Sequence, residues 1–439
     1  DGKVWANGKN NLGQIGDGSL QNKTEYVCIS KPRIVFTESP IRIKGINVEK
    51  DVNAKSYAGF NLLYNEIESG NLEYSVKNVE IAGFNRSGKL VSKKKGKTQV
   101  TVTERTTGTK NSVDVYVLDN NDITFPQIAT YGHSTITLKA NGQIWSYGYN
   151  GYGQLGTGDT SNKYVPTYTG KDKITQIAEG NCYTLALDTD GHVWSVGYNG
   201  YGQLGIGNTT NSTTWQEVKT DENTYLENIT SIVAGTNHAL ALDKDGNVYT
   251  WGTTSYGAIG RDNNNLYAQK VEELENITKI EAGLNSSFAI DSDNNLWATG
   301  YNGYGNLADG TTSNKSVFTK SKMIDSVADV KSNENYSTLI LLQDGSVYGV
   351  GRNYYYNLAN VGGAVPQPIA YNEGLLTGIT EIELGNTFAY AITSDEKLLT
   401  WGYNGYGQLS QGNTNTYITS PTYAKDENNN EIENVMLVN

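Results

Sequence analysis

A short glycine-rich segment recurs seven times along this 439-residue chain, and this repetition constrains the fold more than any other feature. Each copy opens with a glycine, and in six of the seven an asparagine follows two residues later. The two clearest copies read Gly-Tyr-Asn-Gly-Tyr-Gly-Gln-Leu-Gly, at residues 148–156 and 197–205. Self-similarity at a fixed period is typical of repeat architectures, in which each unit buries its apolar face against the next one. The opening glycines are Gly8, Gly148, Gly197, Gly252, Gly300, Gly351 and Gly402.

The spacing of the copies indicates units of similar length interrupted by one insertion. A turn position lies six residues before each opening glycine, and its successive spacings are 140, 49, 55, 48, 51 and 51 residues. The first spacing is too long by about 90 residues for a regular repeat, so an insertion separates the first two copies. The turn positions are Gly2, Gly142, Gly191, Gly246, Asn294, Gly345 and Glu396.

Within one unit the sequence predicts four short strands. Residues 174–178 and 183–187 alternate as two strands, Asp190-Gly191 is a hairpin turn that tolerates positive φ, and residues 192–196 form a third strand. A further short strand follows the glycine-rich loop. Blades of four short strands, repeated around a centre, are the propeller architecture, so we predict an all-β propeller.

The repeated residues also resemble a known family, the regulator of chromosome condensation repeat. Its signature is a segment like A-G-x-x-H-x-L-A-L, then D-G-x-V-W-x-W-G-x-N-x-x-G-Q-L-G. Residues 234–242 read Ala-Gly-Thr-Asn-His-Ala-Leu-Ala-Leu, and residues 190–205 read Asp-Gly-His-Val-Trp-Ser-Val-Gly-Tyr-Asn-Gly-Tyr-Gly-Gln-Leu-Gly. The resemblance implies a seven-bladed β-propeller.

The two ends of the chain suggest how such a ring closes. Residues 432–438 read as the first strand of another unit, and the chain begins at the turn that follows a second strand. We therefore expect the N- and C-terminal strands to share one blade, with the propeller formed by residues 1–32 and 122–439. Residues for the second strand of that blade are missing, so either the full protein supplies them or this blade is one strand short. Because the chain starts in mid-motif without Met, we interpret it as a piece of a longer protein.

The insertion, residues 33–121, differs from the units around it. It lacks Trp and the glycine-rich motif, and residues 72–76, 79–82, 98–103 and 113–117 alternate between apolar and polar side chains. Alternation with period two over several segments predicts a small antiparallel β-sandwich.

Residues 85–102 of the insertion resemble the bacterial immunoglobulin-like domain of group 2. Gly88, Gly96 and the strand that follows match that family's pattern, while Tyr74 stands where the family usually has a core Trp. Such modules are typical of bacterial surface proteins, where they act as spacers or adhesive units. The resemblance therefore implies an extracellular or cell-surface location.

Composition excludes several functions. The formal net charge of -12 disfavours nucleic-acid binding, which depends on Lys and Arg, and no apolar run approaches the roughly 20 residues that span a bilayer. The only cysteines, Cys28 and Cys182, lie at non-equivalent repeat positions, so we expect free thiols. The chain contains no nucleophile elbow, phosphate loop or zinc-binding spacing. We predict no enzymatic activity, no cofactor and no metal.

Repeated tryptophans and one histidine are expected in the core. Trp5, Trp145, Trp194 and Trp297 share one repeat position, and Trp251 and Trp401 lie two residues later on the same strand. Repetition of this kind indicates packing between neighbouring blades. His238 matches the histidine of the family signature, and we interpret it as a hydrogen-bonded core group.

Tyrosine is the one unusual residue of the repeated loops. A propeller places equivalent loops on one face, so these side chains should form a ring there. They either pack across neighbouring loops or contact a partner, and both hold if the rings pack while the hydroxyls face outward. The candidate binding residues are Tyr149, Tyr152, Tyr198, Tyr201, Tyr256, Tyr301, Tyr304, Tyr354, Tyr355, Tyr403 and Tyr406.

Three functions remain open on these grounds. We favour a non-catalytic surface or secreted adhesion module that recognises a protein or a glycan. The second is a specific inhibitor or regulator, because members of the resembling family include a propeller-type β-lactamase inhibitor and an exchange factor for a nuclear GTPase. The third is a carbohydrate-active enzyme, which needs two carboxylates facing each other across a central pocket. Asp190, Asp245, Asp344 and Asp395 recur at hairpin turns, so repetition explains them without chemistry.

Overall fold

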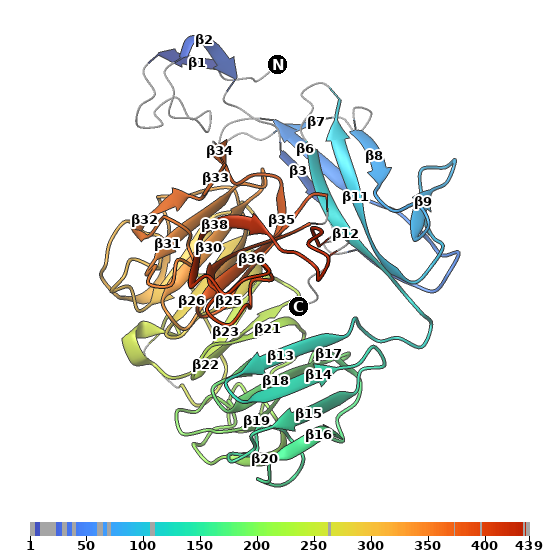
Figure 1. Cartoon of the computed structure of the whole chain (residues 1–439). Coiled ribbons are helices and arrows are strands. Elements are labelled where there is room, and N and C mark those ends of the chain that lie inside the picture. The colour runs from blue at the N-terminus through green and yellow to red at the C-terminus, as the bar shows by residue number, and fades with distance from the viewer. Residues whose placement is uncertain are drawn as a thin grey trace. The chain divides into compact units, whose positions relative to one another are not determined.

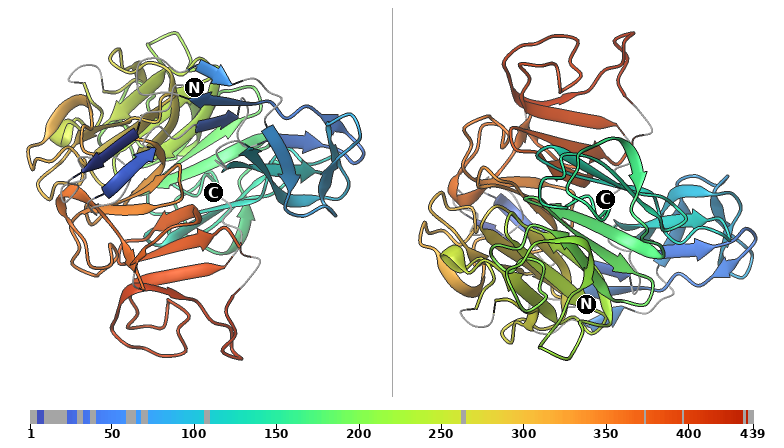
Figure 2. Two further views of the ribbon diagram at one scale, coloured as in Figure 1. Left: turned by 90° about the horizontal axis from the view of Figure 1, so that it is seen from above. Right: turned by 90° about the horizontal axis from the view of Figure 1, so that it is seen from below.

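In the computed structural model, nearly all regular secondary structure of the described residues is β-strand (Figure 1; Figure 2). The chain falls into two compact units, Asp1–Asp122 and Ile123–Asn439, each of which is described by itself below. The predicted domain boundaries, with residues 1–32 assigned to the propeller, stay a prediction. The structure describes residues 5–8, 23–28, 33–36, 41–58, 65–67, 72–105, 110–261, 265–372, 374–395, 397–432 and 435.

In the described part of the second unit the strands form six four-stranded antiparallel sheets, in each of which the strands follow one another in chain order. Repeated four-stranded sheets of this kind are the blades of a β-propeller. The first three sheets are β13 (Gln127–Tyr131), β14 (Ser134–Leu138), β15 (Ile144–Gly148) and β16 (Lys163–Tyr168); β17 (Ile174–Gly180), β18 (Tyr183–Asp188), β19 (Val193–Gly197) and β20 (Ser212–Glu217); and β21 (Ile229–Ala234), β22 (His238–Asp243), β23 (Val248–Gly252) and β24 (Gln269–Lys270).

The remaining sheets repeat the same meander. They are β25 (Ile277–Ala282), β26 (Ser286–Asp291), β27 (Leu296–Gly300) and β28 (Lys315–Lys320); β29 (Val327–Ser332), β30 (Ser337–Leu342), β31 (Val347–Gly351) and β32 (Gly363–Pro368); and β35 (Ile379–Leu384), β36 (Phe388–Thr393), β37 (Leu398–Tyr403) and β38 (Tyr417–Tyr423). A short ribbon of β33 (Ala370–Tyr371) and β34 (Gly374–Leu375) and one 3-10 turn, η2 (Ser255–Gly257), complete the unit.

In the second unit, the opening glycine of each repeat has a conformation that only glycine adopts easily. At Gly197 the backbone φ is 112°, and an added Cβ would collide with the carbonyl oxygen of Cys182 in the adjacent hairpin. Gly148, Gly252, Gly300, Gly351 and Gly402 have the same positive φ and the same close approach. The recurring glycine is therefore explained by backbone geometry.

The sheets are held together by apolar side chains between them. Leu185 and Leu187 of β18 pack in one cluster with Ile229 and Ile232 of the following sheet. Burial of this kind contributes about 25 cal/mol for each Å² of apolar surface removed from water. Because another sheet packs on each face of the sheet that contains β18, its residues Tyr183–Leu187 are buried on both faces.

The tryptophans occupy two different environments. Trp251 is fully buried, and its Nε1 donates to the carbonyl oxygen of Gln203 in the preceding repeat, at 2.9 Å. Trp401 donates in the same way to Asn357. Trp194 is half-buried and donates to Asp188 of its own hairpin, at 2.9 Å. The prediction of packing between blades thus describes Trp251 and Trp401 best, while Trp194 also ties its own hairpin turn.

The first unit is also made of strands. Its sheets are β1 (Trp5–Gly8) with β2 (Lys23–Cys28); β3 (Arg33–Phe36), β6 (Ala54–Ala58) and β7 (Asn65–Ile67); β5 (Glu49–Lys50), β10 (Leu90–Ser92) and β9 (Ala82–Phe84); and β4 (Ile41–Lys44), β12 (Lys110–Leu118), β11 (Gly96–Glu104) and β8 (Leu72–Val76). Strands β4 and β12 run parallel, and the other named pairs are antiparallel.

The core of the first unit lies against the β4-β12-β11-β8 sheet. Val100, Val102, Val113 and Val115 are buried there in alternation with more exposed residues. The strand predicted at residues 79–82 is wrong, because residues 79–81 form a turn. In this turn the Glu80 N–H donates to the Oδ1 of Asn78, at 3.0 Å, and the strand begins only at Ala82.

The predicted closure of the ring falls mostly outside the described residues. The turn positions Gly2 and Glu396 and residues 433, 434 and 436–439 are not among them. Ile432 is described, and its N–H donates to the carbonyl oxygen of Ala424, at 2.9 Å. No helix in the described part of the chain is both long enough and apolar enough to cross a membrane.

Candidate functional site

In each sheet of the second unit, two kinds of loop lie side by side at the same end of the strands. The glycine-rich loop follows the third strand, and the residue after its opening glycine donates its N–H to the hairpin between the first two strands. Tyr198 donates to the carbonyl oxygen of Cys182, and Tyr301 donates to that of Asn285, both at 2.8 Å. The repeated tyrosines therefore lie at the same end of the strands as the first hairpin of their sheet.

The repeated asparagine builds the loop from inside. Asn199 is fully buried, and its Oδ1 accepts from the Leu204 N–H at 2.9 Å. Its Nδ2 donates to the carbonyl oxygens of Asn208 and Thr210, at 2.8 and 3.1 Å. Asn150, Asn302 and Asn404 make equivalent bonds. The asparagine thus satisfies loop backbone groups.

The first tyrosine of each complete motif packs on its own loop. A Cβ added at Gly200 would collide with the hydroxyl of Tyr198, so the ring lies directly over this glycine. The pairs Tyr149 with Gly151, Tyr301 with Gly303 and Tyr403 with Gly405 repeat this contact. The small residue in the Tyr-Asn-Gly sequence is therefore required by the ring above it.

The second tyrosine of each complete motif is more open to solvent. Tyr152, Tyr201, Tyr304 and Tyr406 are 39%, 48%, 40% and 87% exposed. Tyrosines buried only in part combine a large apolar contact area with a hydroxyl that stays free for a partner. Tyr256 and Tyr354, also predicted, are 54% and 64% exposed, so they are as accessible to another molecule as these four.

Contacts between rings join neighbouring loops. Tyr152 lies 5.0 Å from Tyr198, measured between ring centroids, and Tyr256 lies 5.2 Å from Tyr301. Tyr355 lies 6.2 Å from Tyr403. Such edge-to-face pairs add about 0.5–1.5 kcal/mol each beyond area burial. The structure thus brings the predicted tyrosines into ring contacts within and between loops. We use the name tyrosine face for these tyrosines together with Tyr336, Tyr356, Tyr417 and Arg352, which are described next.

Four further residues belong to the tyrosine face and were not predicted. Tyr336 lies in the β29–β30 hairpin, 4.4 Å from the Tyr301 ring. The rings of Tyr356 and Tyr417 pack against each other at a tilt of 56°, with their centroids 5.2 Å apart, and Arg352 lies over Tyr304. Tyr336, Tyr356 and Tyr417 lie outside the first and fourth places of the motif, whereas Arg352 occupies a first place, where most copies have tyrosine. The register of the hairpin, which ends at the same sheet edge, would have indicated Tyr336.

Three of these tyrosines have a backbone conformation that is rare for bulky residues. The φ angles of Tyr256, Tyr336 and Tyr356 are 59°, 59° and 60°, in the left-handed region. Such conformations cost on the order of 1–3 kcal/mol each and occur preferentially at functional sites. Left-handed residues occur in other turns as well, such as Lys173 and Ser326, but bulky aromatic residues in this conformation occur only at these three of the described positions.

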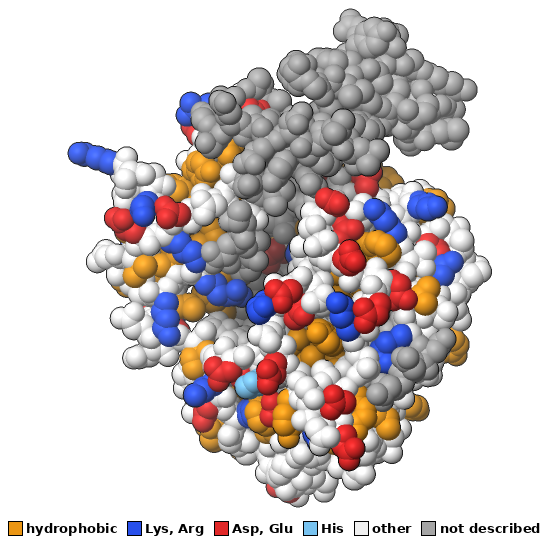
Figure 3. All heavy atoms as spheres, turned by 180° about the vertical axis from the view of Figure 1, so that it is seen from behind, with side chains coloured by type: hydrophobic (Ala, Val, Ile, Leu, Met, Phe, Trp, Pro, Cys, Tyr) orange, Lys and Arg blue, Asp and Glu red, His pale blue; other side chains and the backbone are white. Residues whose placement is uncertain are grey.

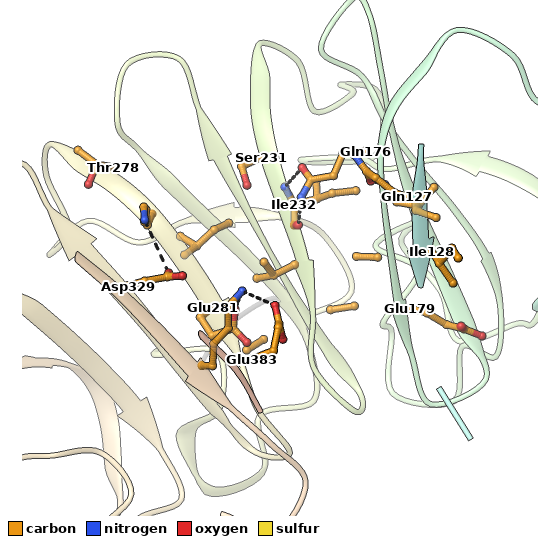
Figure 4. A pocket seen from close by; sticks show the side chains of 18 residues that line it. Gln127, Ile128, Gln176, Glu179, Ser231, Ile232, Thr278, Glu281, Asp329 and Glu383 are labelled. Atoms are coloured by element: carbon orange, nitrogen blue, oxygen red, sulfur yellow. Dashed lines mark hydrogen bonds and ion pairs between the residues drawn. The ribbon is translucent and has the colours of Figure 1, made fainter. Parts of the chain in front are cut away.

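A second feature is a cavity of about 400 Å³ lined by the first strands of all six sheets, β13, β17, β21, β25, β29 and β35 (Figure 4). On one side, where Glu179 of β17 also lies, the Gln176 amide bridges to the backbone N–H and C=O of Ile232, both at 3.0 Å. The other side carries charged residues from β25, β29 and β35. Acidic and basic side chains are also interspersed over the surface seen in Figure 3.

Lys331 stands at the centre of the charged side of the cavity. Its Nζ lies 3.3 Å from the carboxylate of Glu383 and 4.0 Å from that of Glu281. Burial raises the pKa of Glu281 to about 8, against the opposing effect of Lys331. Burial alone would lower the pKa of Lys331, but Asp329, Glu281 and Glu383 together raise it. The described carboxylates here are engaged by a lysine.

Other charged or ionisable side chains of the second unit are also engaged by neighbouring residues of the protein. Asp159 and Asp309, in equivalent loops, pair with Lys163 and Lys315 at 2.7 and 2.9 Å. The described residues include no group of three or more His, Cys, Asp or Glu that could hold a metal ion. His238 is fully buried with its Nε2 3.0 Å from Ser287 Oγ, and burial lowers its pKa to about 4. Its Nδ1 has no hydrogen-bond partner in the described structure, so the core histidine is satisfied on one side only.

Comparison with known proteins places this geometry among relatives. The RCC1-like domain family matches residues 78–438, a range that includes part of the predicted insertion. The mitochondrial RCC1 domain-containing protein RUG3 of Arabidopsis thaliana is 27% identical over 195 residues, 41% of this chain and 43% of that protein. Protein pim1 of Schizosaccharomyces pombe is 24% identical over 226 residues, 46% of this chain and 42% of that protein. The chain thus spans less than half the length of these two relatives.

Solved structures show the same fold. The crystal structure of Prp20p from Saccharomyces cerevisiae superposes with a TM-score of 0.59 at 20% identity, over 69% of this chain and 77% of that one. That of human WBSCR16 gives a TM-score of 0.57 at 20% identity, over 68% and 81%. At this identity the likeness concerns the fold alone.

Proposed function

The chain belongs to the RCC1-like domain family, and from this premise we propose that it is a non-catalytic binding module whose tyrosine face engages a protein partner. The observation that carries the proposal is the set of four solvent-exposed tyrosines, Tyr152, Tyr201, Tyr304 and Tyr406, on loops that are built from inside by buried asparagines. Tyr is enriched in the energetic centres of protein interfaces.

Two further observations support a binding role for this face. Tyr256, Tyr336 and Tyr356 keep a tyrosine in left-handed backbone, where Asn or Gly would be less strained, so the rings themselves are needed at these positions. Prp20p, which shares this fold, has binding properties to Gsp1p and histones, and it has been crystallised bound to Kap60; all of these partners are proteins. This favours a protein partner over a glycan.

We also propose that the propeller has seven blades, with β1 and β2 as the outer strands of the seventh. Trp5 pairs with Cys28, Ala6 with Val27 and Gly8 with Lys23. This is the register of Trp145, Ser146 and Gly148 with Tyr168, Thr167 and Lys163 between β15 and β16, including the irregularity before the glycine.

A second observation on the first sheet points the same way. Ile128 on β13 is 67% exposed, whereas Ile177, Ile232 and Ile280, at the same position of the next three sheets, are buried. An isoleucine in this position normally packs on the preceding blade. Its exposure supports a further blade before β13 in the complete ring.

For the inserted segment we propose a bacterial immunoglobulin-like spacer and, with it, a secreted or cell-surface location. Support comes from the sequence resemblance and from the valine-rich core of the β4-β12-β11-β8 sheet. In this setting the binding module would serve in adhesion. An inhibitor or regulator that acts through the same face is the alternative.

The test is capture of partner proteins by the immobilised chain. We expect the Tyr201→Ala, Tyr304→Ala double variant to fold normally and to lose the proteins that the wild type retains. Tyr164→Ala is the matched control, because Tyr164 on the outer strand β16 is 91% exposed and lies outside the tyrosine face. Equal retention of the same proteins by the double variant would refute the proposal. A parallel glycan array distinguishes sugar recognition.

A further inference from the structure

Arg352 is a cation on the tyrosine face that no carboxylate of the described residues neutralises. It follows Gly351 at the end of β31, and its side chain is half-buried. The guanidinium carbon Cζ lies 5.2 Å from the centre of the Tyr304 ring and 5.4 Å from that of Tyr354. Among the residues that the structure describes, no carboxylate is within ion-pair distance of it. Two aromatic rings therefore position a charge whose polar N–H edge has no anionic partner.

Other cations in the equivalent loops are engaged. Lys163 and Lys315 form short ion pairs with Asp159 and Asp309. Arg261 turns inward, where its Nε donates to Thr250 Oγ1 at 3.0 Å, and burial lowers its pKa to about 10. Three loops thus satisfy their cation internally, and the loop of Arg352 does not.

The nearest acidic residue of the adjoining hairpin is also occupied. Glu334 lies two residues before Tyr336, whose carbonyl oxygen accepts a hydrogen bond from the backbone N–H of Arg352, at 2.9 Å. The Glu334 carboxylate accepts from Asn386 Nδ2 at 2.6 Å, and the Glu334 N–H donates to Asn386 Oδ1 at 3.1 Å. Glu334 is therefore tied to the β35–β36 turn.

This arrangement fits one kind of ligand group. A guanidinium presents its N–H donors in a rigid plane that matches the two oxygens of a carboxylate, and stacked rings reduce the entropy lost on binding. We propose that Arg352 anchors an Asp or Glu carboxylate in an acidic, aromatic-containing segment of a protein partner, while Tyr304 and Tyr354 pack on the flanking side chains. This proposal rests on the proposed function.

Charge favours a single carboxylate over a polyanion. The chain has a formal net charge of -12, which repels nucleic acids and sulfated glycans at long range. A polyanion needs many cations to offset that repulsion, and Arg352 provides one. An isolated carboxylate among apolar neighbours needs only this local contact.

The experiment is selection of random dodecapeptides displayed on phage against the immobilised full chain. Wild type, Arg352→Gln, Arg352→Glu and the Tyr201→Ala, Tyr304→Ala double variant are compared, with thermal unfolding as the control for folding. We expect wild type to enrich Asp or Glu next to aromatic residues. Fluorescence anisotropy with the selected peptides should show at least a tenfold loss of affinity on Arg352→Gln, and Arg352→Glu should select Lys or Arg instead.

The outcomes separate this proposal from the proposed function. Selected peptides that depend on Tyr201 and Tyr304, but lack acidic residues or bind Arg352→Gln equally well, would overturn the role of Arg352 alone. Peptides that bind the double variant as tightly as wild type, or no selection at all, would overturn both. Binding of sialyllactose or a heparin fragment that depends on Arg352 and is as tight as that of the peptides would overturn the assignment to a protein carboxylate.

Discussion

Replacement of Glu179 by Gln gives a sharp test of the packing between the first two sheets. Glu179 lies on β17 and is 8% exposed. Ser134 Oγ of β14 donates to its Oε1, and its Oε2 has no hydrogen-bond partner in the described structure. Burial raises the pKa of this carboxyl to about 8, although the Ser134 hydrogen bond opposes the change.

The sign of the pH effect follows from this raised pKa. Between its ordinary pKa of 4.5 and the folded value of about 8, the carboxyl keeps its proton in the folded protein and loses it in the unfolded chain. The folded state then binds more protons, so the free energy of unfolding falls as pH rises, by about 1.4 kcal/mol for each pH unit. From pH 5 to pH 7.5 the loss from Glu179 is about 3 kcal/mol. Glu179→Gln cannot ionise and should lack this part of the slope.

The measurement is urea unfolding followed by tryptophan fluorescence at pH 5 and pH 7.5. We expect Glu179→Gln to gain stability relative to wild type, by about 3 kcal/mol, as pH is raised between these two values. Glu222→Gln, at an exposed position, is the control and should follow wild type. Glu281 also titrates in this range, but it contributes equally to both proteins. A difference between Glu179→Gln and wild type that does not change with pH would refute the reasoning.

Two other variants test the cavity and the tyrosine face. Lys331→Met leaves Glu281 and Glu383 without their cation, so we expect a loss of about 3–5 kcal/mol at pH 8 that shrinks at pH 5, as measured by urea unfolding. An equal loss at both pH values would contradict the ion-pair role. Tyr336→Asn relieves left-handed strain, so its melting temperature should stay close to that of wild type while partner capture falls. Unchanged capture would show that Tyr336 serves packing alone.

The repeat made the propeller predictable from the sequence. Gly197 recurs because its φ and its close approach to Cys182 exclude a side chain, and Asn199 recurs because it satisfies loop backbone groups. These are local requirements, so each copy states them again. The four-stranded sheets follow from the same periodic signal.

The features that escaped prediction are those in which the repeats differ. Glu281, Lys331 and Glu383 occupy one position in three consecutive first strands, and only their mutual contact reveals an ion-pair network. Arg352 stands where most copies have a tyrosine, so the motif conceals it. Such residues contact partners in a neighbouring repeat, about 50 residues away in the chain. The pattern of apolar and polar residues within one repeat does not predict these contacts.

The contacts between tyrosines of neighbouring loops have a consequence for how this surface can change in evolution. Because Tyr152 reaches the Tyr198 ring of the next loop, a loop that gained or lost residues would withdraw support from its neighbour as well as from itself. New specificity should therefore arise by exchanging individual side chains on loops of conserved length. The loop lengths are therefore fixed while single side chains can vary. Members of the family should differ at the second tyrosine position far more often than in the number of loop residues.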